Sequence, residues 1–221
     1  MREDRTETDG IPATVYDPGR ATALLLLAHG GSHGKDSERF VHLSRRYAEA
    51  TGLAVVCIDA VDHGERKPPD ANVNVPRGWH SNAVDRMIQD WRTTVDAFSA
   101  IGPPIAYVGF SMGVIFGVPT VAALPSIRAA VFAVGGIPAG GGIDDQRLAT
   151  VLFDAASKLD KTQVLMLNKT RDEIFPTEGT HALFDRIPAS KKRLMFWEGS
   201  HDDWPPEMIS QAVNFISDHT R

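Results

Sequence analysis

The sequence is poor in cysteine: Cys57 is the only one, so the chain cannot form an internal disulfide. It also lacks a long apolar run, since residues 24–28 are far too few to span a bilayer. Residues 1–10 include acidic side chains and no apolar stretch, unlike a secretory signal. Acidic residues outnumber basic ones, and the net charge is −5. This argues against a surface that binds nucleic acid or an anionic membrane, because such a surface would need a basic patch. We therefore expect a cytoplasmic monomer or homodimer without nucleic-acid or membrane partners.

Apolar segments of two kinds alternate along the chain. Buried strands are expected at residues 23–28, 53–58, 104–110, 128–134, 163–167 and 192–197. Helical spacing of apolar residues is found at 40–47, 84–98, 114–117, 148–159, 177–186 and 205–216. This alternation predicts an α/β fold with a mostly parallel sheet and helices on both faces.

The length of 221 residues fits a single domain, residues 1–221. Within it, residues 13–16 are expected to form a short edge strand. Residues 1–12 are expected to be a poorly ordered N-terminal segment, since they are polar and have no apolar pattern.

A GxSxG motif, Gly109, Ser111 and Gly113, lies between the strand at 104–110 and an apolar helix. Strand, serine and helix in this order indicate a nucleophile elbow, a turn so tight that side chains beside the serine would collide with neighbouring elements. Ser111 is therefore the candidate nucleophile, with its hydroxyl exposed at the tip of the strand.

A second match to the motif, residues 30–34, makes Ser32 a rival nucleophile. The residues that follow each motif distinguish the two. Val114, Ile115 and Phe116 suit a helix buried against a sheet, whereas Gly34 is followed by polar and charged residues. We therefore prefer Ser111 and assign the loop around Ser32 another role.

Two further candidates follow strands later in the chain, Asp172 and His201. Ligands of open α/β sheets bind beyond the carboxyl ends of the strands, which would bring these residues together with Ser111. A serine hydroxyl needs a base to take its proton, and His201 is placed for this role, with Asp172 orienting the imidazole. Glu173 remains an alternative acid. The other readings are a solvated loop histidine and a helix-capping carboxylate.

The oxyanion of an acyl-transfer intermediate needs two fixed donors. The backbone N–H of Met112 is one by position, and the N–H of Gly31 in the loop after strand 23–28 is the expected second. Loops at the same edge of the sheet supply candidates for the substrate pocket, namely Phe110, His33, Ile137, Phe175 and Trp204. Plain packing is the alternative for each of them.

Two other patterns in the sequence bear on metal or cofactor binding. Asp59, Asp62, His63 and Glu65 lie close together but lack the spacing of metal ligands. The glycine-rich stretch 135–142 lacks the GK[ST] ending of a phosphate-binding loop. We therefore predict no metal and no cofactor.

Taken together, the His29-Gly30-Gly31 loop, the motif around Ser111, Asp172 with Pro176, and Gly199-Ser-His201 resemble the α/β-hydrolase superfamily from about residue 13 to the end. Within it, the chain is similar to the small, lidless serine esterases and the dienelactone-hydrolase-like group. Dienelactone hydrolases proper typically have cysteine as nucleophile, whereas this chain has serine. Only one helix is expected between residues 134 and 163, which is too little for a large cap domain.

The resemblance and the residues lead to the same expectation: a serine hydrolase that cleaves a small carboxylic ester through an acyl-enzyme on Ser111. A thioesterase or an acyltransferase would use the same three residues. A binding protein built on the hydrolase fold is the alternative of another class.

Overall fold

The computed structural model describes residues 1–68, 81–140 and 143–220. In these residues eight strands form one sheet in the order β1-β2-β4-β3-β5-β6-β7-β8. The strands are β1 (Arg2–Thr8), β2 (Ile11–Asp17), β3 (Leu24–Ala28), β4 (Ala54–Ile58), β5 (Ile105–Phe110), β6 (Ile127–Ala133), β7 (Gln163–Lys169) and β8 (Lys192–Trp197). From β4 to β8 in this order, neighbouring strands are parallel. The strand β2 is antiparallel to both of its neighbours, β1 and β4.

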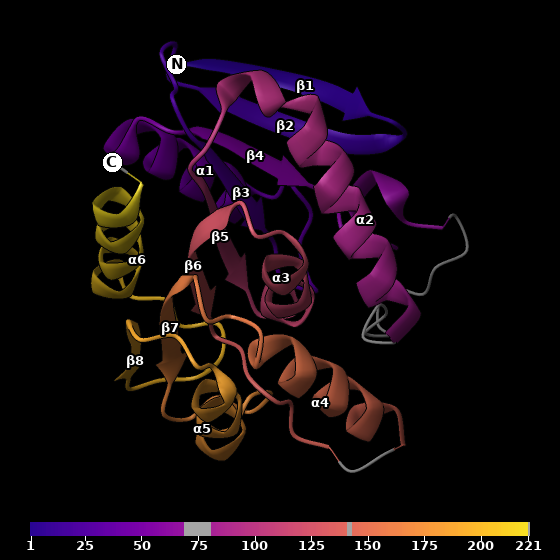
Figure 1. Ribbon diagram of the computed structural model, residues 1–221, viewed down its shortest axis with the longest axis vertical. Helices are drawn as coiled ribbons and strands as arrows, with labels where there is room; N and C mark the ends of the chain where they lie inside the picture. The colour runs from indigo at the N-terminus through magenta and orange to yellow at the C-terminus, as the bar shows by residue number, and fades with distance from the viewer. Residues whose placement is uncertain (69–80, 141–142, 221) are drawn as a thin grey trace.

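The helices cover both faces of this sheet (Figure 1). On one face lie α1 (Glu38–Thr51) and α6 (Pro206–His219). On the other lie α2 (Ser81–Ala97), α3 (Met112–Ala123), α4 (Ile143–Ala156) and α5 (Thr177–Arg186). A separate apolar core fills each side, so the central strands are buried on both faces and consist almost wholly of apolar residues. The predicted α/β fold with a mostly parallel sheet is confirmed.

The crossover helix α1 ends at Thr51, directly before a glycine. Gly52 has a φ of 74°, in the left-handed region that favours glycine, and its N–H donates to the carbonyl of Ala48 at 3.0 Å. The chain then turns directly into β4, the neighbour of β3 in the sheet. This short return places the loops after β3 and β4 side by side at one edge.

The N-terminus differs from the expectation. Residues 2–8 form β1, the edge strand, and β2 lies inside the sheet between β1 and β4. The strand β1 could not be predicted from the sequence, because its side chains are polar and mostly exposed and show no apolar alternation. Its order comes from the ladder with β2 and from Arg45 of α1, which donates two hydrogen bonds to the Glu3 carboxylate, at 2.7 and 2.9 Å.

The segment between β6 and β7 contains a single helix, α4, as expected, and no cap domain in its described part. Within residues 1–68, 81–140 and 143–220, no helix has the length and apolar character needed to cross a bilayer.

Candidate active site

Ser111 occupies the turn between β5 and α3. It has a φ of 55° and a ψ of −114°, a conformation that L residues rarely adopt. Neighbouring glycines make the turn possible: a Cβ on Gly109 would lie 2.3 Å from the carbonyl oxygen of Gly113, and one on Gly113 would lie 2.6 Å from that of Ala28. The Ser111 N–H donates to Ala133 of β6 at 2.9 Å, which ties the turn to the sheet. This is the elbow geometry that the motif predicts.

His201 connects Ser111 to Asp172 through an unbroken chain of hydrogen bonds. The distance from His201 Nε2 to Ser111 Oγ is 2.9 Å, and that from His201 Nδ1 to Asp172 Oδ2 is 2.8 Å. A carboxylate can only accept, so Nδ1 carries the proton and Nε2 is left as the acceptor for the serine hydroxyl. The imidazole is therefore in the tautomer that general-base chemistry requires.

The Asp172 carboxylate is itself held in place by backbone donors. Its Oδ1 accepts hydrogen bonds from the N–H groups of Ile174 and Phe175, at 2.9 and 2.8 Å. Glu173, the alternative acid, points elsewhere and accepts the backbone N–H of His201 at 3.1 Å. The structure thus gives the two acidic neighbours different contacts: Asp172 faces the imidazole, and Glu173 anchors the main chain that bears it.

The two residues expected to supply the oxyanion donors, Gly31 and Met112, lie next to each other. A Cβ on Gly31 would be 3.8 Å from Met112 Sδ and 3.9 Å from Met112 Cβ, and one on Gly30 would be 3.4 Å from Ser111 Cβ. Among the described residues, neither the N–H of Gly31 nor that of Met112 donates a hydrogen bond. Gly31 therefore lies next to Met112, and the N–H groups of both residues are left free to donate to a ligand.

Ser32, the rival nucleophile, is exposed in the turn that follows Gly30. No histidine nitrogen in the described part of the chain bonds to its hydroxyl, whereas Ser111 is only 6% exposed and hydrogen-bonded to His201.

The acidic and histidine residues after β4 make contacts of another kind. Asp59 accepts backbone N–H groups from Lys35 and Glu65, and His63 Nδ1 donates to the carbonyl of Val61 at 2.8 Å. In the described residues, no group of three or more potential ligands is placed to hold a metal ion.

The substrate-pocket candidates divide into buried and accessible residues. Phe110 and Phe175 are both 0% exposed; Phe110 stacks on Trp204 with ring centroids 4.5 Å apart, in the core beside α1 and α6. His33, Ile137 and Trp204 are partly exposed. Trp204 also donates its Nε1–H to the His201 carbonyl at 2.8 Å, so it contacts the loop that bears the base. Accessible lining can therefore come from His33, Ile137 and Trp204.

The sequence did not predict the contacts that hold the loop bearing His201 in place. Besides Glu173 and Trp204, these include Lys169 at the end of β7, which is fully buried and lies 3.5 Å from Asp203 Oδ2. A lysine at the end of a buried strand is the signal that could have indicated it, since such a residue needs a partner.

His29, at the start of the loop that contains Gly31, is buried as a neutral imidazole. Its Nε2 accepts the Ala60 N–H at 3.0 Å, and its Nδ1 donates to the carbonyl of Gly30 at 2.8 Å. Burial lowers the pKa of His29 to about 4, with a smaller contribution in the same direction from His63; the bond to Gly30 and the Asp59 charge oppose the shift only in part.

This lowered pKa predicts a loss of stability in acid. A histidine in the unfolded chain titrates at about pH 6.5, so between that pH and about 4 the unfolded state binds more protons than the folded state. The free energy of unfolding should fall as the pH is lowered through this window, by roughly 3 kcal/mol in total. Urea unfolding at about pH 7 and about pH 4.5 measures the fall.

The His29→Gln variant should lose much of this dependence, because its side chain can still accept from Ala60 but does not titrate. His181→Gln is the matched control at an exposed histidine and should keep the parent's dependence. An equal fall in the parent and in His29→Gln would contradict the assignment.

Comparison with known proteins places this chain in a family. A family model described as the alpha/beta hydrolase family matches residues 25–213, which include Ser111, Asp172 and His201. The chain belongs to the alpha/beta hydrolase family. The superfamily resemblance read from the motifs is thus confirmed, and no curated protein matches the sequence.

Solved structures of this hydrolase fold include several esterases. A cold-adapted esterase from an Arctic intertidal metagenomic library, in a PEG-bound complex, is 26% identical, with a TM-score of 0.83 over 100% of this chain and 94% of that one. The protein TT1662 from Thermus thermophilus is 24% identical, with a TM-score of 0.78 over 98% of this chain and 97% of that one. The Pyrococcus furiosus esterase Pf2001 is 13% identical, with a TM-score of 0.76 over 100% and 93%, and shows the shared fold.

Proposed function

We propose that this hydrolase cleaves small carboxylic esters through an acyl-enzyme on Ser111, without a cofactor. The observation that carries the proposal is the hydrogen-bond chain from Ser111 Oγ through His201 to Asp172, with distances of 2.9 and 2.8 Å. Similarity to a cold-adapted esterase over nearly the full length of both chains supports an ester as the substrate.

In the acylation step, His201 Nε2 takes the Ser111 proton as Oγ attacks the ester carbonyl carbon. Asp172 stabilises the imidazolium that forms and keeps its Nδ1 proton in place. The carbonyl oxygen becomes an oxyanion and accepts from the N–H groups of Gly31 and Met112. When the bond to the alcohol oxygen breaks, His201 returns the proton from Nε2 to the leaving alcohol.

Deacylation repeats these steps with water. His201 Nε2 takes a proton from water as its oxygen attacks the acyl carbon, and the same two N–H groups hold the second oxyanion. The bond to Ser111 Oγ then breaks, and Oγ regains a proton from His201. The products are the carboxylic acid and the free enzyme.

The surroundings of Ser111 favour a substrate with a short acyl group. The single helix α4 forms no cap domain in the described part of the segment between β6 and β7, and the rings of Phe110 and Phe175 are both packed in the core, with 0% exposure. We therefore expect the highest kcat/KM with short acyl groups.

Labelling with a fluorophosphonate followed by peptide mass spectrometry tests the proposed nucleophile. We expect the modification on the peptide with Ser111 and none on the peptide with Ser32, because in the described part of the chain Ser111, unlike Ser32, has a histidine within hydrogen-bond distance. Label on Ser32, or no label at all, would refute the proposal.

Substrate profiling tests the bond that is cleaved. Turnover of p-nitrophenyl esters of graded acyl length should be compared with that of the matching thioesters, with and without an added alcohol as acceptor. A higher kcat/KM for thioesters would indicate a thioesterase, and acyl transfer to the alcohol at a higher rate than hydrolysis would indicate an acyltransferase. Either result would replace the esterase assignment and leave the role of Ser111 unchanged.

A further inference from the structure

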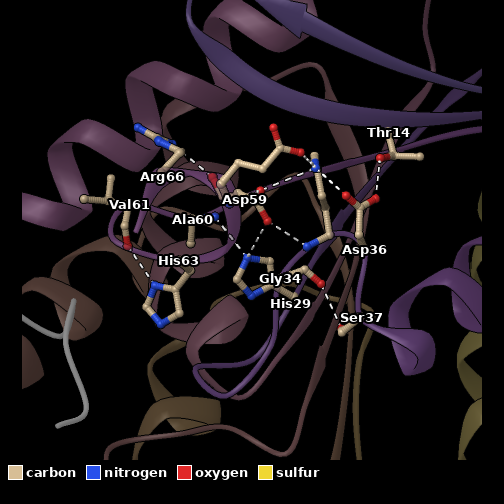
Figure 2. A network of polar contacts seen from close by, with 12 residues as sticks. Thr14, His29, Gly34, Asp36, Ser37, Asp59, Ala60, Val61, His63 and Arg66 are labelled. Carbon is tan, nitrogen blue, oxygen red and sulfur yellow. Dashed lines mark hydrogen bonds and ion pairs between the residues drawn. The ribbon is translucent and has the colours of Figure 1, made fainter. Parts of the chain in front are cut away.

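The loop that contains Gly31 is joined to the loop after β4 by a cluster of polar side chains, which we call the Asp59 cluster: Lys35, Asp36, Asp59 and Glu65. Asp36 and Asp59 are labelled in the network that Figure 2 shows. Asp59 is its centre and is 1% exposed. One carboxylate oxygen, Oδ1, accepts the Lys35 N–H at 2.8 Å, and the other, Oδ2, accepts the Glu65 N–H at 3.0 Å. A single side chain therefore holds the main chain of both loops.

Two glycines allow the loops to approach this carboxylate closely. A Cβ on Gly34 would lie 2.9 Å from Asp59 Oδ1. One on Gly64, where φ is 53°, would lie 2.0 Å from the same oxygen. No larger residue fits at Gly64 without moving the carboxylate, so the position of Asp59 depends on glycine at this point of the loop.

Lys35 neutralises the buried charge. Its ammonium, in a residue that is 1% exposed, lies 3.5 Å from Asp59 Oδ2 and also bonds to Asp36, at 2.7 Å, and to Glu65. A buried carboxylate without a partner would be costly, and removing one partner of such a group is more damaging than removing both. Lys35 is therefore the cation that pairs with the buried carboxylate of Asp59.

His29 makes a second tie between the same loops. Its ring joins the Ala60 N–H, directly after Asp59, to the carbonyl of Gly30. The tie ends one residue before Gly31, and Gly30 packs against the Cβ of Ser111. Fixed contacts thus flank Gly31, at Gly30 before it and at Lys35 after it.

From this arrangement we infer that Asp59 is a positioning residue for the oxyanion site: it fixes the loop from which the Gly31 N–H is presented to the reacting carbonyl oxygen. The inference rests on the proposed function. Donors stabilise an oxyanion only at about 2.7–3.1 Å from the oxygen, and a displacement of about 1 Å can cost on the order of 100-fold in rate. Because this stabilisation is realised in the transition state, its loss lowers kcat and leaves KM nearly unchanged.

The test is Asp59→Asn in the full chain, with active sites counted by fluorophosphonate titration so that unfolded molecules do not enter kcat. An amide keeps one acceptor and loses the other, which releases one of the two loops. We expect kcat per titrated site to fall about 10- to 100-fold with KM within about twofold of the parent. Affinity for a trifluoromethyl ketone, which forms a tetrahedral adduct on serine, should fall in parallel with kcat/KM. The acid limb of the pH profile should stay in place because the base is untouched.

Asp17→Asn is the matched control. Its Oδ1 also accepts a backbone N–H, from Gly19 at 2.7 Å, in an exposed turn outside the site. It should leave kcat and KM unchanged.

Gly34→Ala serves as a second, milder variant, since it pushes on Asp59 Oδ1 without removing the charge. It should show the same selective loss of kcat. An Asp59→Asn enzyme with the parent's kcat per site would overturn the inference alone. So would loss of all labelling in both variants, which would show that the cluster holds the fold and not the donor. Absence of Ser111 labelling in the parent would instead overturn the proposed function, and the inference with it.

Discussion

Ser111→Ala should reduce ester turnover by about 10,000-fold or more, to the level of the background reaction. Without Oγ there is no atom to form the acyl-enzyme, and the oxyanion donors can assist only a direct attack by water. The side chain is small, and among the described residues the hydrogen bond of its hydroxyl is to His201, so the fold should persist. Initial rates with a short p-nitrophenyl ester, together with circular dichroism and thermal unfolding, measure both effects.

The matched control is Ser32→Ala, which removes the hydroxyl of the second GxSxG motif from an exposed turn. It should keep kcat and KM within about twofold of the parent values. Turnover retained by Ser111→Ala and lost by Ser32→Ala would reverse the assignment of the nucleophile.

Asp172→Asn should lower kcat by about 1,000- to 10,000-fold. The amide can turn its oxygen toward Ile174 and Phe175, whose N–H groups now bond to Oδ1, and it then presents its NH₂ group to His201. The imidazole would move its proton to Nε2 and could no longer accept from Ser111. Pre-steady-state measurement of the acylation burst, beside steady-state kcat, locates the loss in the proton-transfer steps.

Glu173→Gln is the control for this variant, because the amide oxygen can still accept the backbone N–H of His201. We expect its kcat to stay within about tenfold of the parent. A larger loss in Glu173→Gln than in Asp172→Asn would show that Glu173, and not its neighbour, orients the base.

Much of the fold follows from local patterns because the central strands are buried on both faces. Such strands have to be apolar throughout, as β3 and β4 are, and the helices between them have to show one apolar side. The strand β1 could not be predicted in this way. It has exposed charged side chains, and its stability comes from pairing with β2 and from the contact between Glu3 and Arg45, which are far apart in the sequence.

The candidate site was predictable to the extent that chemistry and chain order define it. Ser111, Asp172 and His201 each follow a strand, and parallel strands bring their carboxyl ends to one edge. The residues that line or support the site could not be predicted in this way. Phe110 is one residue from Ser111, yet its side chain points to the core beside α1 and α6, because successive residues of a strand face opposite sides of the sheet.

By itself the sequence determined the class of this protein: the order of strands and helices, the tight glycine-flanked turn at Ser111, and a base and an acid downstream of it. Only the tertiary structure decided which partners these groups have. It placed Asp172 rather than Glu173 against His201, and it brought the Asp59 carboxylate to the main-chain N–H groups of Lys35 and Glu65. The physical reason is that a motif specifies residue types along the chain, whereas a hydrogen bond depends on two loops arriving within about 3 Å of each other.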